Sequence, residues 1–277
     1  MNGRKAAISL CMLCALLGSG IVAQSAGAIT GTTAFTCKEE PTFTFDFKDR
    51  HCKEVSGGKF GKFNHVFIAE NTTTELAGNN SGEVTKLKTT VGGVAVTLSS
   101  TSLSVSGTME NKVDITGEHY SHGEGTGVYT GVTVSVPKCF VYRDATGLVG
   151  EQGTVETEAL TGTTTAQGDA VKFTPRTGEL FARFWILDKN KKTSAEGGEC
   201  FIGATYFVTG SVTGTPEGAT IKFTHEGVTT QNTLKMGIAL GGGSKAGLEG
   251  RLTLEGTDPK IVTDVFKPLS ATTVATE

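Results

Sequence analysis

The chain has 277 residues, with 25 Lys and Arg against 28 Asp and Glu, so its formal net charge is −3 at pH 7. A nucleic-acid-binding surface normally carries a basic excess, and the longest basic cluster here is residues 189–192, which argues against a nucleic-acid partner. The 38 glycines, the abundant threonine and the lack of good helix-forming stretches indicate strands joined by turns rather than helices.

The first 28 residues have the organisation of a signal peptide. Arg4 and Lys5 precede the uncharged residues 6–23, and Ala26-Gly27-Ala28 forms a small-x-small cleavage site. A membrane anchor is the rival interpretation, because an apolar run of about 18 residues is at the short limit for a span. We predict a signal helix that is removed, leaving residues 29–277 as a secreted or cell-surface region without a membrane span.

The cysteines predict two disulfides. Two of the six cysteines leave with the signal peptide, and Cys37, Cys52, Cys139 and Cys200 remain. An even number in an exported chain favours disulfides, and four cysteines allow three pairings. We favour Cys37–Cys52 and Cys139–Cys200, because only a short segment separates the first two. A zinc site is the alternative, but it would lack any Cys-x-x-Cys pair, and no cofactor is predicted.

Alternation of apolar and polar residues recurs along the chain and is typical of strands. In residues 43–47 three phenylalanines alternate with polar residues, which places the rings on one face. Residues 181–187 are apolar nearly throughout, as expected for a central strand covered on both faces. Residues 200–213 predict its antiparallel neighbour, joined to it by a polar loop.

Three glycine-led segments, residues 93–99, 168–174 and 218–224, each follow a Thr-rich strand and predict a strand, a glycine turn and a second strand. Their spacing is irregular, which argues against a solenoid. We therefore expect an all-β, antiparallel β-sandwich-like architecture built from these hairpins. A weak division of the chain lies near residues 147–153, where glycine and charge cluster.

Residues 118–124 hold the densest group of metal-ligand side chains. Glu118, His119, His122 and Glu124 supply two imidazoles and two carboxylates, a donor set that suits Zn²⁺. In a strand, however, an offset of three residues places the two histidines on opposite faces. A polar hairpin tip is the alternative interpretation, so these four residues are only weak candidates for a metal site.

Glu156 and Glu158 lie two residues apart in a predicted strand, so their side chains share a face. A close pair of carboxylates is what a retaining glycosidase uses. An exposed strand edge explains the same spacing and is commoner. No sequence pattern of a nucleophilic hydrolase accompanies the pair, and no catalytic residue is assigned.

Several short motifs together resemble a family of exported proteins. These are residues 36–37, 47–52, 213–215, 221–226 and 247–255. They are similar to Thr/Gly-rich proteins that soil actinobacteria encode in many related copies, a family without an assigned function. The resemblance implies export and an all-β fold, and many copies suit interaction at the cell envelope better than metabolism.

Two functions remain in competition. The first is a non-catalytic extracellular or envelope-associated protein that binds an unknown extracellular or surface ligand. The second is a secreted carboxylate- or metal-dependent hydrolase that uses residues 118–124. The hydrolase needs a concave site where these side chains converge, whereas side chains that point apart favour the binding protein. A secreted inhibitor or a self-assembling subunit is a third possibility.

Overall fold

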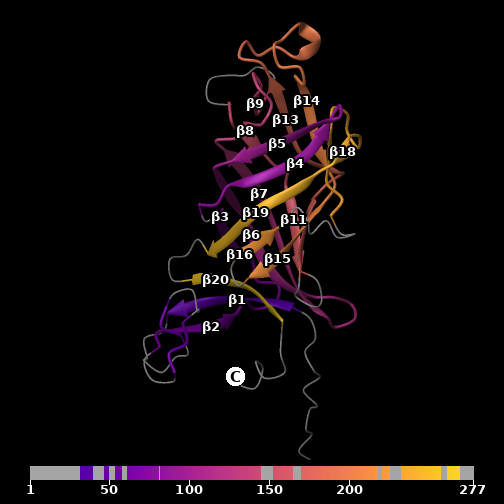
Figure 1. The fold of residues 1–277 in the computed structure, drawn as a ribbon. Coiled ribbons are helices and arrows are strands. Elements are labelled where there is room, and N and C mark those ends of the chain that lie inside the picture. The colour runs from indigo at the N-terminus through magenta and orange to yellow at the C-terminus, as the bar shows by residue number, and fades with distance from the viewer. Residues whose placement is uncertain are drawn as a thin grey trace, which may run out of the picture.

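The structure is a computed structural model (Figure 1). It describes residues 32–39, 47–49, 54–57, 61–80, 82–144, 152–164, 170–217, 220–224, 232–256 and 261–268. The signal helix, Cys52 and most of the boundary near residues 147–153 lie outside this part of the chain, so these remain predictions. Within the described residues, no helix has the length and apolarity needed to cross a membrane.

The all-β prediction is confirmed, since the described residues form antiparallel strands and one short 3-10 helix, η1 (Ser194–Glu196). The strand pairings of the predicted hairpins are also confirmed, because β4 pairs with β5, β11 with β12 and β15 with β16, while the turns at Gly168 and Gly218 lie outside the described residues. The first of these turns at Gly92 and Gly93, whose φ angles of 54° and 83° are strained for residues that carry a side chain.

Eight strands close into a barrel, and the predicted sandwich is therefore wrong. Around the ring they are β16 (Thr220–Phe223), β15 (Val212–Glu217), β12 (Val171–Pro175), β11 (Leu160–Thr164), β7 (His119–Thr130), β6 (Ser102–Val113), β3 (Thr74–Asn79) and β19 (Gly247–Gly256). The pairing of β16 with β19 completes the ring, so these strands leave no open edge. Alternating strands suit a sandwich and a barrel equally, and this one pairing decides between them.

Side chains alternate across the barrel wall. On β6, Leu103 and Met109 point inward and are buried, whereas Ser104 and Ser106 between them are exposed on the outer face. Threonine hydroxyls bond across the outer face, from Thr161 to Thr174 at 2.8 Å, for example. The barrel thus has an apolar inside and a polar outside, as the alternation predicts.

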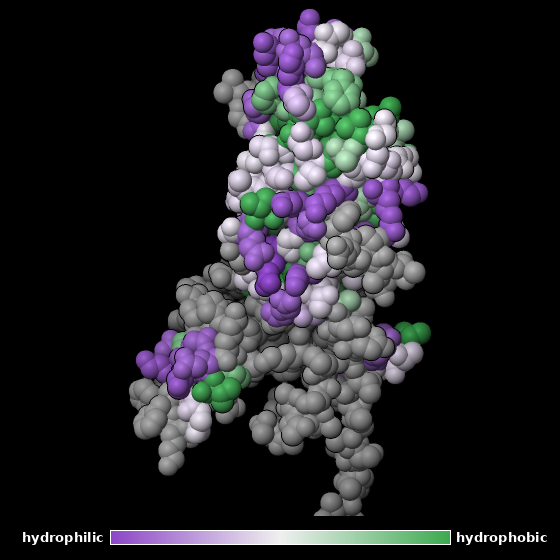
Figure 2. Space-filling view, viewed as in Figure 1, coloured by the Kyte–Doolittle hydropathy of each residue, from purple (hydrophilic) through white to green (hydrophobic). Residues whose placement is uncertain are grey.

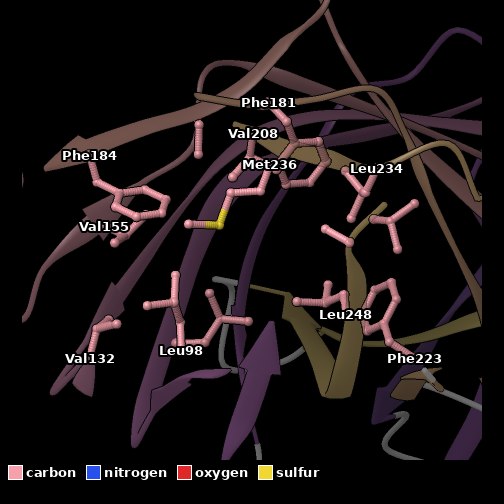
Figure 3. Close-up of a cluster of buried hydrophobic side chains, with 14 of the residues drawn as sticks. Leu98, Val132, Val155, Phe181, Phe184, Val208, Phe223, Leu234, Met236 and Leu248 are labelled. Atoms are coloured by element: carbon pink, nitrogen blue, oxygen red, sulfur yellow. The ribbon is translucent and has the colours of Figure 1, made fainter. Parts of the chain in front are cut away.

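An upper part continues the barrel (Figure 1). One layer extends from β19 through β4 (Thr85–Val91), β5 (Val94–Ser100) and β8 (Thr133–Val134). The other is a five-stranded sheet of β18 (Ser244–Lys245), β17 (Lys235–Gly237), β14 (Ala204–Thr209), β13 (Leu180–Leu187) and β9 (Phe140–Tyr142). The short β10 (Val155–Glu156) pairs with β7. Side chains from the opposed layers point toward one another and form the core shown in Figure 3.

The upper part confirms two further predictions. β13 is a central strand, with β14 on one side and β9 on the other, as its continuous apolar sequence indicates. Cys139 and Cys200 form a disulfide with a Cα–Cα distance of 4.9 Å. The bond spans 61 residues and joins the start of β9 to the loop before β14.

A third sheet lies across the lower end of the barrel (Figure 1). It consists of β2 (Phe63–Phe67), β1 (Thr32–Glu39) and β20 (Ile261–Pro268), and it contacts the barrel through β1 and β7 and through β19 and β20. The backbone of Cys37 lies in β1, while the predicted Cys37–Cys52 bond falls outside the described residues.

Candidate functional site

The inside of the barrel is not filled by its side chains. A cavity of about 90 Å³ remains there. Its walls are almost entirely apolar, and the large aliphatic and phenylalanine side chains among them are Leu76, Leu103, Val105, Met109, Leu160, Val171, Phe173, Phe181, Val212, Phe223, Leu248, Leu252 and Leu254. The interior of an eight-stranded barrel can be just filled by side chains or can leave room for one small molecule, and side chains do not fill this interior.

Glycines on the inner face of β7 are one cause of the hollow interior. Gly123, Gly125 and Gly127 are spaced by two residues, so all three face the cavity. Their neighbours on the adjacent strands are also glycines, since Gly107 pairs with Gly125 and Gly162 pairs with Gly123. Inward positions that usually fill a small barrel therefore carry no side chain here.

Two different constraints operate at these glycines. At Gly125, a Cβ would lie 2.5 Å from the carbonyl oxygen of Ser106, so the close approach of β6 and β7 excludes a side chain. At Gly127, a Cβ would lie 3.5 Å from Leu103 and 3.6 Å from Thr157, which is ordinary van der Waals contact. Backbone crowding therefore requires glycine at position 125, whereas space for a side chain exists at position 127.

A second cavity of about 60 Å³ is lined by side chains from both layers of the upper part. Tyr129, Thr157, Phe181 and Leu248 line both cavities, so the two are neighbours. The other apolar walls of the smaller cavity are Leu87, Leu98, Val132, Val155, Ala182, Phe184, Val208 and Leu234 (Figure 3). The same four side chains therefore bound both spaces.

The hydroxyl of Tyr129 is a polar group within this apolar surround. Burial raises the pKa of Tyr129 to about 12, so the phenol stays protonated at neutral pH. The ring nevertheless keeps part of its accessible surface, because that surface faces the cavities that it lines. The hydroxyl has no hydrogen-bond partner among the described residues.

Thr85 supplies a second hydroxyl of the same kind. The residue is 4% exposed, lines the smaller cavity, and its Oγ1 has no hydrogen-bond partner in the described structure. Two other hydroxyls of the lining are engaged, since Ser100 donates to the carbonyl oxygen of Thr130 and Thr157 accepts from the amide of Gly127. Thr85 is therefore a buried donor without an acceptor.

The cavities contain no free charge among the described residues. Glu124 is the one charged residue in their walls, and its carboxylate lies 3.1 Å from the guanidinium of Arg176. An ionised ligand would lose its hydration inside without gaining an ionic partner, at a cost of several kcal/mol or more. The arrangement therefore suits uncharged molecules.

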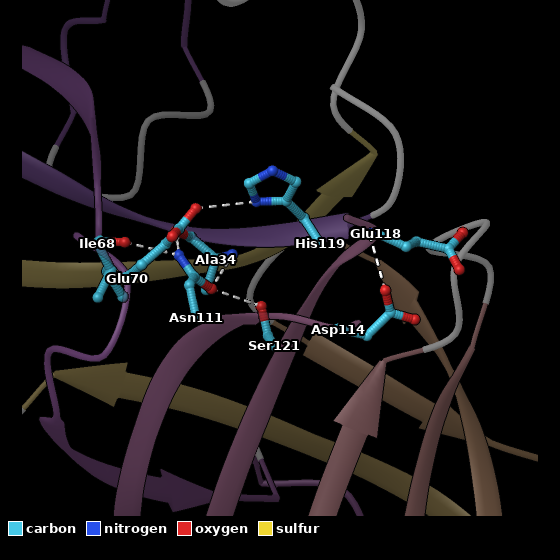
Figure 4. A network of polar contacts seen from close by, with 8 residues as sticks. All are labelled: Ala34, Ile68, Glu70, Asn111, Asp114, Glu118, His119 and Ser121. Atoms are coloured by element: carbon cyan, nitrogen blue, oxygen red, sulfur yellow. Dashed lines mark hydrogen bonds and ion pairs between the residues drawn. The ribbon is translucent and has the colours of Figure 1, made fainter. Parts of the chain in front are cut away.

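Asn111 closes the lower end of the barrel (Figure 4). Its side-chain oxygen accepts from the Ala34 amide and the Ser121 hydroxyl, each at 2.8 Å, and its amide group donates to the carbonyl oxygens of Ala34 (2.9 Å) and Ile68 (2.8 Å). Asn111 is 1% exposed, so all four bonds form away from water. One inward-facing side chain thus ties β1 across the opening.

The predicted metal-site residues do not converge. His119 lies 3.3 Å from Glu70, whereas His122 lies 3.7 Å from Glu124 and belongs to the opposite face of β7. The backbone amide of Glu118 donates to the carboxylate of Asp114 in the turn between β6 and β7 (Figure 4), and the Thr116 side chain, then the Glu118 amide, lower the pKa of Asp114. No group of three or more His, Cys, Asp or Glu in the described residues is arranged to hold a metal ion.

The carboxylates of the other candidate pair lie on the outside. Glu156 and Glu158 line one polar groove of about 340 Å³, together with Arg143 and Arg183. Glu156 is ion-paired with Arg143, and the Arg183 guanidinium lies 5.3 Å from the ring centroid of Trp185. The groove is lined by two positively and two negatively charged side chains. One of each, Arg143 and Glu156, form the ion pair.

An apolar groove of about 500 Å³ also lies on the outer surface of the upper part. Phe201 and Ile238 line it and are 58% and 67% exposed. In Figure 2, hydrophobic side chains gather below the hydrophilic upper tip of the molecule, while hydrophilic ones spread over its middle. The groove exposes these apolar side chains on the outer surface, whereas the apolar lining of the larger cavity lies inside the barrel.

Sequence reasoning missed the barrel cavity, although a signal for it exists. The three glycines of β7 share one face at a spacing of two, but the abundance of glycine along the whole chain obscures this local pattern. In a half-buried strand such spacing leaves a row of empty inner positions. Tyr129 and Thr85 carry no comparable signal, because their positions depend on which strands meet.

Comparison of the chain with protein-family models, curated proteins and solved structures found no match. The class is therefore defined by the fold and site alone, as a closed eight-stranded antiparallel barrel with an apolar internal cavity.

Proposed function

We propose that the protein is an exported, non-catalytic binding protein whose barrel holds a small apolar molecule, acting outside the cell or at its surface. The observation that carries the proposal is the cavity of about 90 Å³ with apolar walls, continued by a second of about 60 Å³. Apolar cavities of comparable size, on the order of 150 Å³, stay dry and bind benzene or xenon.

The cost of the cavity supports a function for it. Empty volume in a protein core costs about 24 cal/mol per Å³, or about 2 kcal/mol for the larger cavity. That is a sizeable part of the stability of a typical domain. A side chain at Gly127 would remove part of this cost at ordinary contact distances, yet the position is glycine. A ligand that fills the space recovers the lost contacts and gives a reason to keep it open.

The location outside the cytoplasm rests on two observations. The Cys139–Cys200 disulfide suits an oxidising compartment. The order of charge, apolar run and small residues in the first 28 residues suits export. A non-catalytic role is supported by the residues of the predicted metal site, because His119 and His122 lie on opposite faces of β7 and no three such ligands among the described residues converge.

The test is benzene binding to the purified protein, followed by NMR chemical shifts and by thermal unfolding at several benzene concentrations. We expect saturable binding that raises the unfolding temperature, because a ligand that binds only the folded state stabilises it. Dyes for apolar surfaces are unsuitable probes, since the outer groove at Phe201 and Ile238 would also bind them.

A pair of variants locates the binding. Gly127→Val places methyl groups in the cavity, and Ser104→Val adds a similar side chain to the exposed face of the neighbouring strand. We expect Gly127→Val to weaken benzene binding about tenfold, as about 1.4 kcal/mol of lost contact would do, and Ser104→Val to leave it unchanged. Absence of saturable binding, or equal binding by both variants, would contradict the proposal.

A further inference from the structure

Exposed apolar side chains gather beside the outer groove of the upper part (Figure 2). Phe201 and Ile238 line that groove and are 58% and 67% exposed, and Leu240, in the same loop as Ile238, is 56% exposed. Such a gathering marks contact with a protein or a membrane. We infer that these three side chains, with Lys235 and Lys245, form a docking patch for the surface of an anionic lipid bilayer. The inference goes beyond the barrel ligand and does not depend on it.

The hairpin of β17 and β18 carries four of the five residues of the docking patch. Its strands pair Lys235 with Lys245, and the loop 238–243 between the strands holds Ile238 and Leu240. The loop is short and its last three residues are glycines, so these two side chains are the large apolar groups that it presents to solvent. The hairpin thus has exposed apolar side chains in its loop and one lysine on each strand at its base.

The two lysines at the base of the hairpin face each other. Side chains directly opposite in an antiparallel pair lie on the same face, and two like charges there repel. Lys235 and Lys245 are exposed, and neither forms an ion pair with a residue that the structure describes. Glu179 approaches the loop of this hairpin, yet it pairs with neither lysine. On the adjoining strand β4, by contrast, Lys88 lies 2.8 Å from Glu249. An anion from outside the protein would relieve the repulsion between the two lysines.

The loop between β13 and β14 adds positive charge next to the patch. It forms the upper tip of the molecule in Figure 1 and contains Phe201. Its lysines, at positions 189, 191 and 192, are exposed. Its three acids are all engaged: Asp188 and Glu196 accept from backbone amides of the loop, and Glu199 pairs with Lys138. This loop and the hairpin therefore present an excess of cations, although the whole chain has an excess of acids.

A bilayer suits this combination better than a second copy of the chain. In a two-fold symmetric dimer the same patch lies on both partners, so lysines would face lysines. Lysine is also depleted at protein interfaces. At a bilayer, apolar side chains enter the boundary between headgroups and acyl chains, while lysine stems extend along that boundary to the lipid phosphates. Each lysine near an anionic surface strengthens the attraction.

The experiment is sedimentation of the purified protein with lipid vesicles. Vesicles of phosphatidylcholine alone are compared with vesicles that also contain phosphatidylglycerol, at low and at high salt. We expect the protein to bind the mixed vesicles more tightly. Added salt should weaken this binding, because it screens charges at an exposed surface.

Two variants test the two components of the patch. Ile238→Ser removes an inserted apolar side chain and should weaken binding to the mixed vesicles about fivefold. Lys235→Gln combined with Lys245→Gln should weaken it about twentyfold and remove most of its dependence on salt.

Matched controls change the same residue types elsewhere. Ile115→Ser replaces an isoleucine that is fully exposed in the turn between β6 and β7. Lys62→Gln combined with Lys172→Gln removes two exposed positive charges from the lower sheet side and the barrel wall. Both controls should bind the mixed vesicles as the wild-type protein does. Thermal unfolding confirms that every variant is folded.

The outcomes separate this inference from the proposed function. Absence of binding to the mixed vesicles would overturn the inference, and so would equal losses in the patch variants and their controls. A concentration-dependent dimer that Ile238→Ser dissociates, without vesicle binding, would show that a second copy covers the patch and would also overturn it. Benzene binding in the barrel should be the same in all these variants, so failure of the inference leaves the proposed function standing.

Discussion

Two buried tyrosines show how differently the barrel and the upper part are built. Tyr206 stacks on Phe184 in the upper part, with ring centroids 6.1 Å apart, and its hydroxyl donates to the carbonyl oxygen of Ile202 at 2.6 Å. Tyr129 stands at the top of the barrel, beside both cavities, and its hydroxyl has no partner in the described residues. Burial raises the pKa of both to about 12. The same residue type is thus part of a closed core in one region and of an open site in the other.

This difference between the two tyrosines extends to the regions around them, the upper part and the barrel. The upper part surrounds the smaller cavity with fully buried side chains from two layers, and it also contains a hydrogen-bonded tyrosine and a disulfide, which are features of a rigid core. The barrel instead is held by a closed ring of backbone hydrogen bonds between its strands. It can therefore form without side chains that fill its interior. A rigid upper part can therefore hold the barrel open around its cavity.

The disulfide makes the strongest test of this division. Replacing both Cys139 and Cys200 by Ala should lower the free energy of unfolding by about 4 kcal/mol, because the bond closes a loop of 61 residues. The measurement is denaturant unfolding. Two alanines are preferable to a reducing agent, which would also open any bond at Cys37. A loss of unfolding free energy below about 1 kcal/mol would show that the upper part does not depend on the Cys139–Cys200 disulfide.

Asn111 tests whether the lower end of the barrel is held by one side chain. Asn111→Ala leaves the amide of Ala34 and the carbonyl oxygen of Ile68 buried without their partner, which should cost about 3 kcal/mol. The exchange of the Ala34 amide hydrogen should accelerate more than that of amides in β13. Lys112→Ala is the control on the outer face, where loss of the exposed ion pair with Glu110 should cost under about 0.5 kcal/mol. Equal losses of stability in Asn111→Ala and Lys112→Ala would contradict the prediction that Asn111 holds the lower end of the barrel.

The smallest expected effect on stability is the response to acid. It is tested at Asp188, in the loop that follows β13 in the upper part. The Asp188 carboxylate accepts from the backbone amides of Lys192, Glu199 and Asn190, with Lys192 the largest influence, and these bonds lower the pKa of Asp188. A lowered pKa contributes stability above the unfolded value, about 3.9, and this contribution is lost as the pH falls through the folded value.

The expected result is therefore a loss of stability as the pH falls below about 4 that is smaller in Asp188→Asn than in the wild-type protein. Denaturant unfolding at a series of pH values measures it. Asp114→Asn is the comparison in the barrel, where the turn that Asp114 caps is exposed and its contribution should be weaker. Parallel pH profiles for the wild-type protein and Asp188→Asn would remove Asp188 from the acid response.

Part of the site was within reach of sequence reasoning and part was not. The offset of three between His119 and His122 already placed them on opposite faces of a strand, and the structure has them so. The spacing of Gly123, Gly125 and Gly127 held a signal for empty inner positions that was not used. That Thr85 and Tyr129 line one cavity had no signal, because β4 and β7 are not neighbours in the sheet.

The sequence by itself determined the local features of this protein. Alternation along β6 decides which face of the strand is apolar, the unbroken apolar run decides that β13 is central, and glycine pairs decide where hairpins turn. These depend on neighbouring residues and on the two-residue period of a strand. Only the tertiary structure decided that β16 pairs with β19, which turns a sheet into a barrel. Alternation shows which face of a strand is apolar, but it does not show what that face packs against. In a closed barrel, the apolar face of each strand points toward other strands of the same sheet, across a space that can hold a ligand.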